Sequence, residues 1–189
     1  EVFVCTSEAF SVSAHKGKAE DLRVERRSGV ALRGLLGGQM GYAATEAEGE
    51  AAYAELVRAA AENAALLESK DEQFLYDGDE KLAWVSAVDE SLPAVSPERK
   101  IALALEMERL CKAEDPRIAS GTTCEVGTTT SACLLLNTEG LRREFARGAA
   151  YAVADAVLAD GDRQYEEVAY RFSRKFEDLD PVVIAREAV

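Results

Sequence analysis

Apolar and polar side chains alternate along residues 1 to 45, as they do in strands that bury one face. Turn sequences interrupt the alternation at Lys16-Gly17, Ser28-Gly29 and Gly37-Gly38. Because a short turn between alternating runs favours a hairpin, this block predicts antiparallel strands joined by hairpins.

The period then changes to that of a helix. Apolar residues at helical spacing between 48 and 69 predict one amphipathic helix covering one sheet face. Residues 71 to 95 keep no period and are predicted to be a linker. A second helix is expected to begin at Ser96-Pro97-Glu98, which supplies an N-cap, a first-turn proline and an acid, and to end before Pro116.

Strands are expected again from residue 118. The stretch 141–160 is rich in alanine, which favours a helix, but Tyr151 and Val153 alternate and turns flank the stretch, so it is predicted to be a long strand. A closing helix is expected from Asp180-Pro181. The predicted fold is α+β, with two modules of antiparallel hairpin strands packed with helices: an N-terminal domain at 1–70, a linker at 71–95 and a central domain at 96–189.

Charge narrows the classes of partner. The net charge of −13 argues against nucleic acid and against an anionic membrane, because both require clustered Lys and Arg. No apolar run approaches the ~20 residues that span a bilayer. We therefore expect a globular protein that binds neither.

The four cysteines are Cys5, Cys111, Cys124 and Cys133, and their spacing is unlike that of a zinc site or a disulfide framework. Each lies in an apolar or strand-like context, where a thiol behaves as a small buried hydrophobe. We predict free thiols and a reduced, cytoplasmic compartment.

The single histidine, His15, precedes a Lys-Gly turn on the polar side of its strand. A catalytic zinc takes about three protein ligands, and nothing near His15 supplies the others. We interpret His15 as a surface residue, and we assign no metal ligand in the chain.

Glycine-rich and acidic turns also resemble sites. Gly34–Gly41 lacks both the phosphate-loop and the dinucleotide patterns, so it is predicted to be a tight hairpin. The turns Asp77-Gly78-Asp79-Glu80 and Asp160-Gly161-Asp162 lack the later residues of a calcium loop and are interpreted as solvated turns.

Two further sets of residues are candidates for catalysis. Glu106 and Glu108 are two apart on a helix and do not share a face, so they form no carboxylate pair. The hydroxyl-rich stretch from Ser120 to Ser131 has no histidine near it in sequence. One hypothesis is a solvated strand; another is a strand edge that hydrogen-bonds an extended peptide. We find no catalytic residue.

Three stretches together resemble the TldD/PmbA family, the so-called modulators of DNA gyrase. They are AFSVSAHKGKAEDLRVERRSGVALRGLLGGQMGYAAT, DPRIASGTTCEVGTTTSACLLLNTEGL and YRFSRKFEDLDPVVIAREAV. Their shared order covers nearly the whole chain. The hydroxyl-rich strand and the closing FEDLD segment are more similar to the PmbA (TldE) branch.

The resemblance implies a cytoplasmic metallopeptidase system that processes or degrades peptides, including peptide antibiotics, with two related subunits around a cavity. In TldD-type members a His-Glu-x-x-x-His motif binds zinc, whereas PmbA-type members lack it. This sequence has no such motif, so no catalytic residue, cofactor-binding residue or metal ligand can be carried onto it.

We therefore expect an N-terminal and central segment of a longer PmbA-type protein, since the chain opens in a strand pattern without Met and closes in a helix pattern. Its expected role is scaffold, peptide-holding surface and contact with a related subunit, as a homo- or heterodimer, while any zinc belongs to a TldD-type member. Whether the chain takes part in catalysis stays open.

The alternative is a stand-alone acidic module that binds a basic protein. A hydrolase that uses a hydroxyl nucleophile lacks a visible base.

Overall fold

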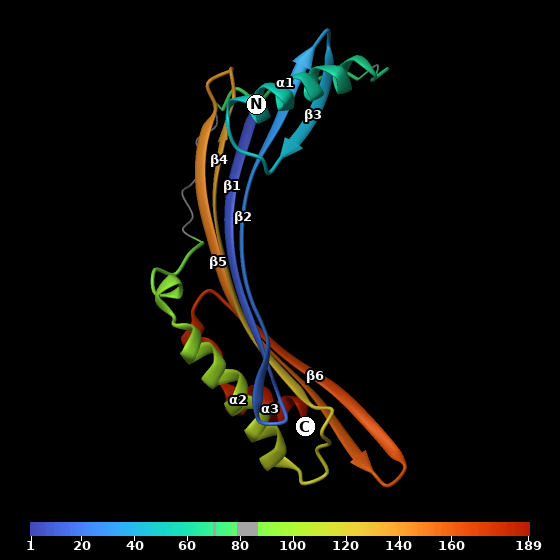
Figure 1. The fold of residues 1–189 in the computed structure, drawn as a ribbon, viewed down its shortest axis with the longest axis vertical. Coiled ribbons are helices and arrows are strands. Elements are labelled where there is room, and N and C mark those ends of the chain that lie inside the picture. Colours follow the sequence, from blue (N-terminus) through green and yellow to red (C-terminus); the bar gives the residue numbers. More distant parts are fainter. Residues whose placement is uncertain (70, 79–86) are drawn as a thin grey trace. The chain divides into compact units, whose positions relative to one another are not determined.

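A computed structural model describes residues 1–69, 71–78 and 87–189 (Figure 1). Six strands form one antiparallel sheet in the order β3-β2-β1-β4-β5-β6. The strands are β1 Val2–His15, β2 Lys18–Leu36, β3 Gln39–Thr45, β4 Thr123–Leu136, β5 Arg142–Asp160 and β6 Arg163–Ser173. The helices are α1 Glu50–Ala65, α2 Pro97–Glu114 and α3 Pro181–Ala188, with short 3-10 turns at Leu92–Ala94 and Phe176–Asp178. The expected α+β fold class is confirmed.

The chain divides into two compact units, and each consists of separate segments. Unit 1 comprises Glu1–Ser7, the described residues of Arg26–Ser86, and Ser131–Ala146. Unit 2 comprises Glu8–Glu25, Ala87–Thr130 and Arg147–Val189. Strands β1, β2, β4 and β5 therefore each contribute residues to both units. The division into domains expected from the sequence stays a prediction.

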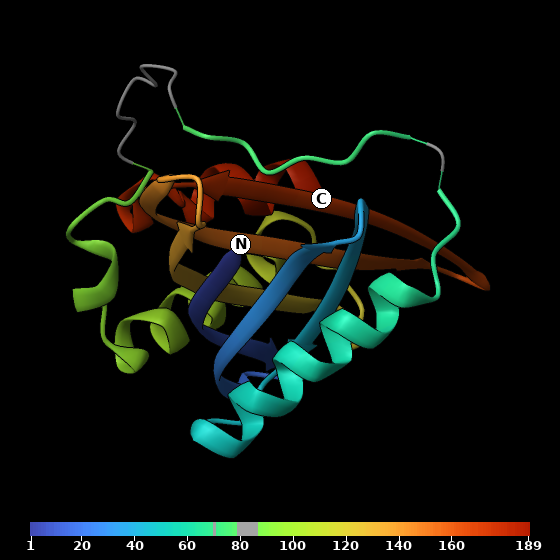
Figure 2. The same ribbon diagram turned by 90° about the horizontal axis from the view of Figure 1, so that it is seen from above.

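In unit 1, α1 lies along β3 at close range (Figure 2). The close approach depends on Gly41, because a Cβ atom there would lie 1.8 Å from the Ala60 carbonyl oxygen and 2.6 Å from the Ala64 nitrogen. Leu56, Ala60 and Ala64 are the buried residues of the helix. A strand glycine and helix alanines thus let the two backbones pack almost directly on each other.

In unit 2, α2 and α3 lie side by side against one face of the sheet, and the apolar core fills the space between (Figure 1). Alternate residues of β5 point into this core as fully buried alanines, whose small size leaves room for larger side chains from the helices. Met107 and Ile184 supply that volume, with no exposed surface on either. The other buried members from the strands are Phe10, Val12, Ala14, Cys124, Val126 and Ala169.

The helix starts follow from their caps. The Ser96 side chain accepts a hydrogen bond from the Arg99 N–H, and Asp180 accepts from Val182 and Val183. Both caps precede a proline at the first helical position, where a missing N–H costs nothing. The predicted starts of α2 and α3 are confirmed, and so is the long strand at β5.

One predicted turn is wrong. Ser28-Gly29 does not end a strand, because β2 continues through it from Lys18 to Leu36. Gly29 is absent from the glycines with positive φ, so the backbone stays extended there and makes no turn. A Ser-Gly pair allows a turn without requiring one.

Part of the predicted linker can be described. Leu92–Ala94 forms a 3-10 turn, and Ala87 forms an isolated bridge with Arg147 of β5. Trp84, the single tryptophan of the chain and part of the predicted linker, lies outside the described residues. Among the described residues, no helix is long and apolar enough to cross a bilayer.

Candidate functional site

The sheet of unit 2 has a second face, turned away from α2 and α3, where aromatic and acidic side chains gather. Because neighbours in a strand point to opposite sides, the residues that alternate with the buried β5 alanines lie on this face. We call it the aromatic face and define it by Ser11, Glu125, Tyr151, Asp155, Val168, Tyr170 and Phe172.

Tyr151 lies at its centre, over Gly127 of the neighbouring strand. A Cβ atom on Gly127 would lie 2.3 Å from the Tyr151 ring, so only glycine leaves space for the ring in this position. The Tyr151 hydroxyl donates to Glu125 Oε1 over 2.6 Å. Burial, together with this bond to Glu125, raises the pKa of Tyr151 to about 12, while Ser11 and Arg23 act in the opposite direction. Tyr151 is therefore a protonated donor at neutral pH, and it orients the Glu125 carboxylate.

Phe172 and Tyr170 continue the aromatic surface onto β6. The Tyr151 and Phe172 residues are cross-strand partners, and their ring centroids are 5.8 Å apart. Tyr170 meets Phe172 edge to face at 5.9 Å. These two β6 rings are 60% and 66% exposed, which is unusual for large apolar side chains that already have neighbours.

Asp155 adds an unused acceptor beside the rings. Its Oδ1 atom is buried and has no hydrogen-bond partner among the described residues. A buried carboxylate oxygen without a donor is costly, so a small movement that exposes it to a ligand N–H or ammonium group would be favourable. The aromatic face thus combines apolar contact surface with acceptors, a combination suited to peptide segments that carry apolar and basic side chains.

His15 lies at the end of β1 in unit 2. Its Nδ1 atom is 3.2 Å from the Thr122 carbonyl oxygen, so we assign the proton to Nδ1 as the donor. Across the described residues, no cluster of three or more His, Cys, Asp or Glu side chains is arranged to hold a metal ion. The interpretation of His15 as a residue without a metal stays a prediction.

Glu108 of α2 holds the turn that follows His15. It accepts a 2.8 Å hydrogen bond from the Gly17 N–H and another from Lys112, although only 1% of Glu108 is exposed. Burial by itself would raise the pKa of Glu108, but the bonds from Lys112 and the turn outweigh it, and the pKa is lowered. Glu106 pairs instead with Arg109 at the surface. The two glutamates thus have different partners, and the absence of a catalytic carboxylate pair stays a prediction.

The predicted turns are found where the structure describes them. Gly37 and Gly38, both with positive φ, join β2 to β3, and Asp160–Asp162 joins β5 to β6. Gly78 also has positive φ, whereas Asp79 and Glu80 of the same predicted turn lie outside the described residues.

The hydroxyl-rich stretch is not a strand edge, so that hypothesis is wrong. Strand β4 lies between β1 and β5, and both of its sides are already paired. Thr122 and Thr128 are buried, and the Thr122 hydroxyl takes the place of a backbone group by accepting from the Val157 N–H over 3.0 Å. Sequence order gave no indication that this strand would be central.

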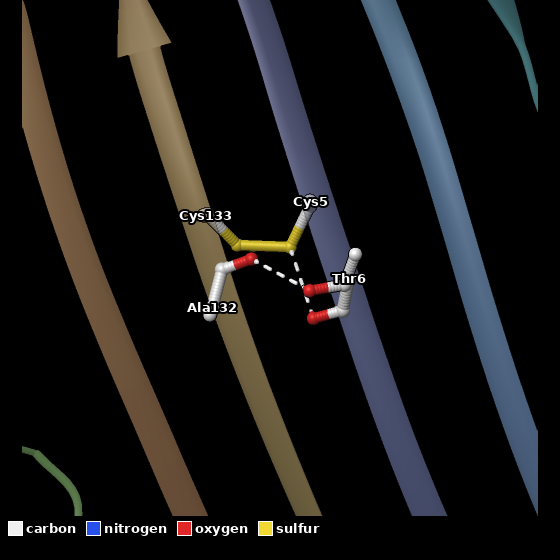
Figure 3. The surroundings of a disulfide bond; sticks show 4 residues. All are labelled: Cys5, Thr6, Ala132 and Cys133. Carbon is white, nitrogen blue, oxygen red and sulfur yellow. Dashed lines mark hydrogen bonds between the residues drawn. A yellow bond between two sulfur atoms is a disulfide. The ribbon is translucent and has the colours of Figure 1, made fainter. Parts of the chain in front are cut away.

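The prediction of four free cysteines is wrong for two of them. Cys5 and Cys133 form a disulfide between the neighbouring strands β1 and β4, and the Thr6 hydroxyl donates to Ala132 beside it (Figure 3). The two cysteines are 128 residues apart, and only the strand order brings them opposite each other. Cys111 and Cys124 are free and buried, as predicted. The bond to Cys111 and burial raise the pKa of Cys124, which keeps that thiol protonated.

Two family models match the chain. Residues 1–64 match domain 1 of the PmbA/TldA metallopeptidases, and residues 90–189 match their central domain. The chain belongs to the TldD/PmbA family. The resemblance first seen in the motif order is thereby confirmed.

Solved structures share the fold of this TldD/PmbA-family chain. A candidate modulator of DNA gyrase from Thermotoga maritima has a TM-score of 0.86 at 18% identity, covering 99% of this chain and 42% of that one. TldE from Thermococcus kodakarensis has a TM-score of 0.85 at 18% sequence identity, and the match covers 99% of this chain and 42% of TldE. A further candidate modulator of DNA gyrase, from Bacteroides thetaiotaomicron, has a TM-score of 0.86 at 19% sequence identity, and the match covers 99% of this chain and 43% of that protein. The chain thus spans less than half the length of these proteins, and no curated protein matches it.

Proposed function

We propose that this chain serves a TldD/PmbA-type peptide-processing system by holding peptide and a related subunit, without carrying the chemistry itself. Membership of a metallopeptidase family supports the system. The aromatic face carries the proposal for this chain. Exposed Tyr170 and Phe172 offer apolar contact, and Glu125 and Asp155 offer acceptors within the same sheet face.

The described donor set does not fit a catalytic zinc. The chain has one histidine, whose Nδ1 bonds to a backbone carbonyl, and four cysteines. Cys5 and Cys133 are bonded to each other in a different unit, and Cys111 and Cys124 are free and buried but belong to no cluster of three or more metal-binding side chains among the described residues. We therefore derive no step through zinc in this chain, and we propose the PmbA/TldE-like branch. Zinc analysis of the purified chain checks this: stoichiometric metal together with peptide hydrolysis would contradict it.

Peptide binding tests the role of the aromatic face. The probe is a fluorescein-labelled, extended peptide that alternates Phe or Leu with Lys, and anisotropy reports its Kd. We expect Phe172→Ala to weaken binding at least tenfold, a loss of about 1.4 kcal/mol. Gly127→Ala should weaken it too, because the added Cβ displaces the Tyr151 ring.

A matched control is Tyr53→Ala, since Tyr53 is an exposed aromatic residue of α1 in unit 1. It should leave the Kd unchanged. If instead Phe172→Ala binds as the wild type does while raised salt abolishes binding, the chain is the acidic module that attracts basic partners through its charge of −13.

A cytoplasmic location is part of the proposal, and Cys5 and Cys133 test it. Disulfides rarely persist in a reducing cytoplasm. Thiol labelling of protein quenched rapidly from cells should find both cysteines reduced. A bond that is fully formed at quenching would indicate an oxidising compartment.

A further inference from the structure

The two sulfur atoms of the Cys5–Cys133 bond are covered to different extents. Cys133 is only 5% exposed, whereas Cys5 is half-buried and lines a hollow of about 390 Å³ in unit 1. The hollow is bounded by residues of β1, β2 and β3, and its apolar lining includes Phe3, Ala31 and Ala44. A small molecule therefore reaches the bond from the Cys5 side.

The hollow also lies on the side of Cys5 from which a disulfide is attacked. A thiolate bonds to one sulfur in line with the S–S bond and displaces the other sulfur. Strand β4 lies on one side of β1, and β2 lies on the other. Figure 3 shows the bond running across the strands from Cys133 to Cys5. Its extension beyond Cys5 passes over β2, where residues 29–31 line the hollow.

Gly29 keeps this approach clear. Glu1 and Arg33 exchange both backbone hydrogen bonds, at 2.9 and 3.0 Å, which fixes the antiparallel register of β1 with β2. Counting from this pair places Gly29 directly opposite Cys5, and residues directly opposite each other lie on the same face. A Cβ atom on Gly29 would make only an ordinary contact, 3.6 Å from the Thr45 carbonyl oxygen, and the φ of Gly29 is not positive. Neither packing nor backbone conformation therefore requires glycine here, and what it provides is space in front of Cys5.

We propose that Cys5 is a modification site, at which a small aminothiol opens the bond and stays attached as a mixed disulfide in the hollow. The thiolate sulfur bonds to Sγ of Cys5, the bond to Cys133 breaks, and Cys133 leaves as a thiolate that takes a proton from water. One disulfide replaces another, so the step consumes no oxidant or reductant. The site does not depend on the proposed function, because the aromatic face belongs to unit 2.

The lining of the hollow selects an aminothiol. Its apolar residues suit the short methylene chain of such a molecule, and the exposed carboxylate of Glu46 also lines it. Arg33, on the same face, is paired with Glu1. The charge of Glu46 favours an ammonium group and disfavours a thiol that carries carboxylates. We therefore expect cysteamine to react in preference to glutathione.

Single-cysteine variants test which sulfur is modified. Cys133→Ser keeps the Cys5 thiol, and Cys5→Ser keeps the Cys133 thiol. With cystamine, the disulfide of cysteamine, Cys133→Ser should gain the adduct about tenfold faster than Cys5→Ser, because its thiol is accessible. Mass spectrometry of the intact protein measures the adduct, peptide mapping places it, and circular dichroism confirms that both variants fold. Equal rates, or a faster reaction of Cys5→Ser, would overturn the proposal.

Substitution of Gly29 tests the path of attack. In the oxidised protein, opening of the bond by cysteamine is followed by acid quenching and mass spectrometry. Gly29→Ala should slow the opening and Gly29→Val should slow it about tenfold, because each side chain stands in the line of approach. The matched control is Gly34→Ala, on the opposite face of the same strand, which should open as fast as the wild type. A Gly29→Val protein that folds and opens as fast as the wild type would reject the in-line path.

Reversal of one charge tests the class of thiol. The measured quantity is the ratio of the opening rates with cysteamine and with glutathione, compared at equal thiolate concentration. Glu46→Lys should lower this ratio severalfold. Glu48→Lys makes the same change in net charge at an exposed residue outside the lining of the hollow, and it should leave the ratio nearly unchanged. If both variants lower the ratio equally, or if the wild type prefers glutathione, the hollow does not select an aminothiol and the proposal is wrong.

Discussion

The two units hold their helices against the sheet by different means. In unit 1, α1 packs on β3 through Gly41, Ala60 and Ala64, so backbone meets backbone and little side-chain volume is buried. In unit 2, α2 and α3 bury a continuous apolar core that includes Met107 and Ile184. Unit 1 also carries the disulfide, which unit 2 does not.

This difference determines what each unit tolerates. A contact with no spare space fails when atoms are added, whereas a core filled by large side chains fails when atoms are removed. Where the Cys5–Cys133 bond is formed, it adds stability to the unit that buries less apolar volume. Substitutions of opposite kinds should therefore act in different units.

The largest effect should come from Gly41→Ala. The new Cβ atom would lie 1.8 Å from the Ala60 carbonyl oxygen, so α1 must move off β3. We expect a loss of about 4 kcal/mol or more in the stability of unit 1, in the range of severe steric substitutions. Hydrogen exchange should show lost protection in α1 with protection retained in α2. The control is Gly34→Ala, whose Cβ atom would make an ordinary 3.6 Å contact.

Ile184→Ala should be next and should act in unit 2. Ile184 is fully buried, and its truncation leaves a cavity that costs about 3–4 kcal/mol. Urea unfolding measures the loss. Val182→Ala, on the exposed side of the same helix, should cost far less. Equal losses for the two variants would show that α3 is not packed as described.

Loss of the disulfide should follow. The bond closes a span of 128 residues, and its replacement by Cys5→Ala with Cys133→Ala should cost about 2–4 kcal/mol. Dithiothreitol should destabilise the wild type by a similar amount and leave the double variant unchanged. If the reductant acts equally on both proteins, it is acting elsewhere.

Much of the fold could be predicted because it depends on local pattern. Period-two alternation identified the strands, and Ser96-Pro97 and Asp180-Pro181 identified two helix starts. The pairing of Cys5 with Cys133 could not be predicted, since it depends on which strands become neighbours. The same holds for the Tyr151–Glu125 bond and for the central position of β4: Tyr151 and Glu125 come from different strands, and nothing in either strand's own pattern indicates the other.

The smallest effect, and a pH-dependent one, should come from Glu108→Gln. Because the folded pKa of Glu108 is lowered, its contribution is present above the unfolded value of 4.5 and is lost as pH falls through the folded value. We expect a deficit of about 1–2 kcal/mol at pH 7, from weakened charge-assisted hydrogen bonds, that shrinks below pH 4. Urea unfolding at both pH values measures it.

The matched control is Glu106→Gln. Glu106 forms an exposed ion pair with Arg109, and such pairs contribute little to the free energy of unfolding. The deficit of Glu106→Gln at pH 7 should be much smaller than that of Glu108→Gln, because water screens the exposed pair. A Glu108→Gln deficit that grows on acidification would contradict the lowered pKa of Glu108 in the folded protein.

Because β1, β2, β4 and β5 each supply residues to both units, the polypeptide is interlaced. A single proteolytic nick just after α1 would therefore not release two independent bodies. The N-terminal piece would keep β1 inserted between β2 and β4, and under oxidising conditions Cys5 would tether it to the C-terminal piece. The two pieces, expressed separately, should reassemble on mixing, which makes this chain suited to split-protein complementation.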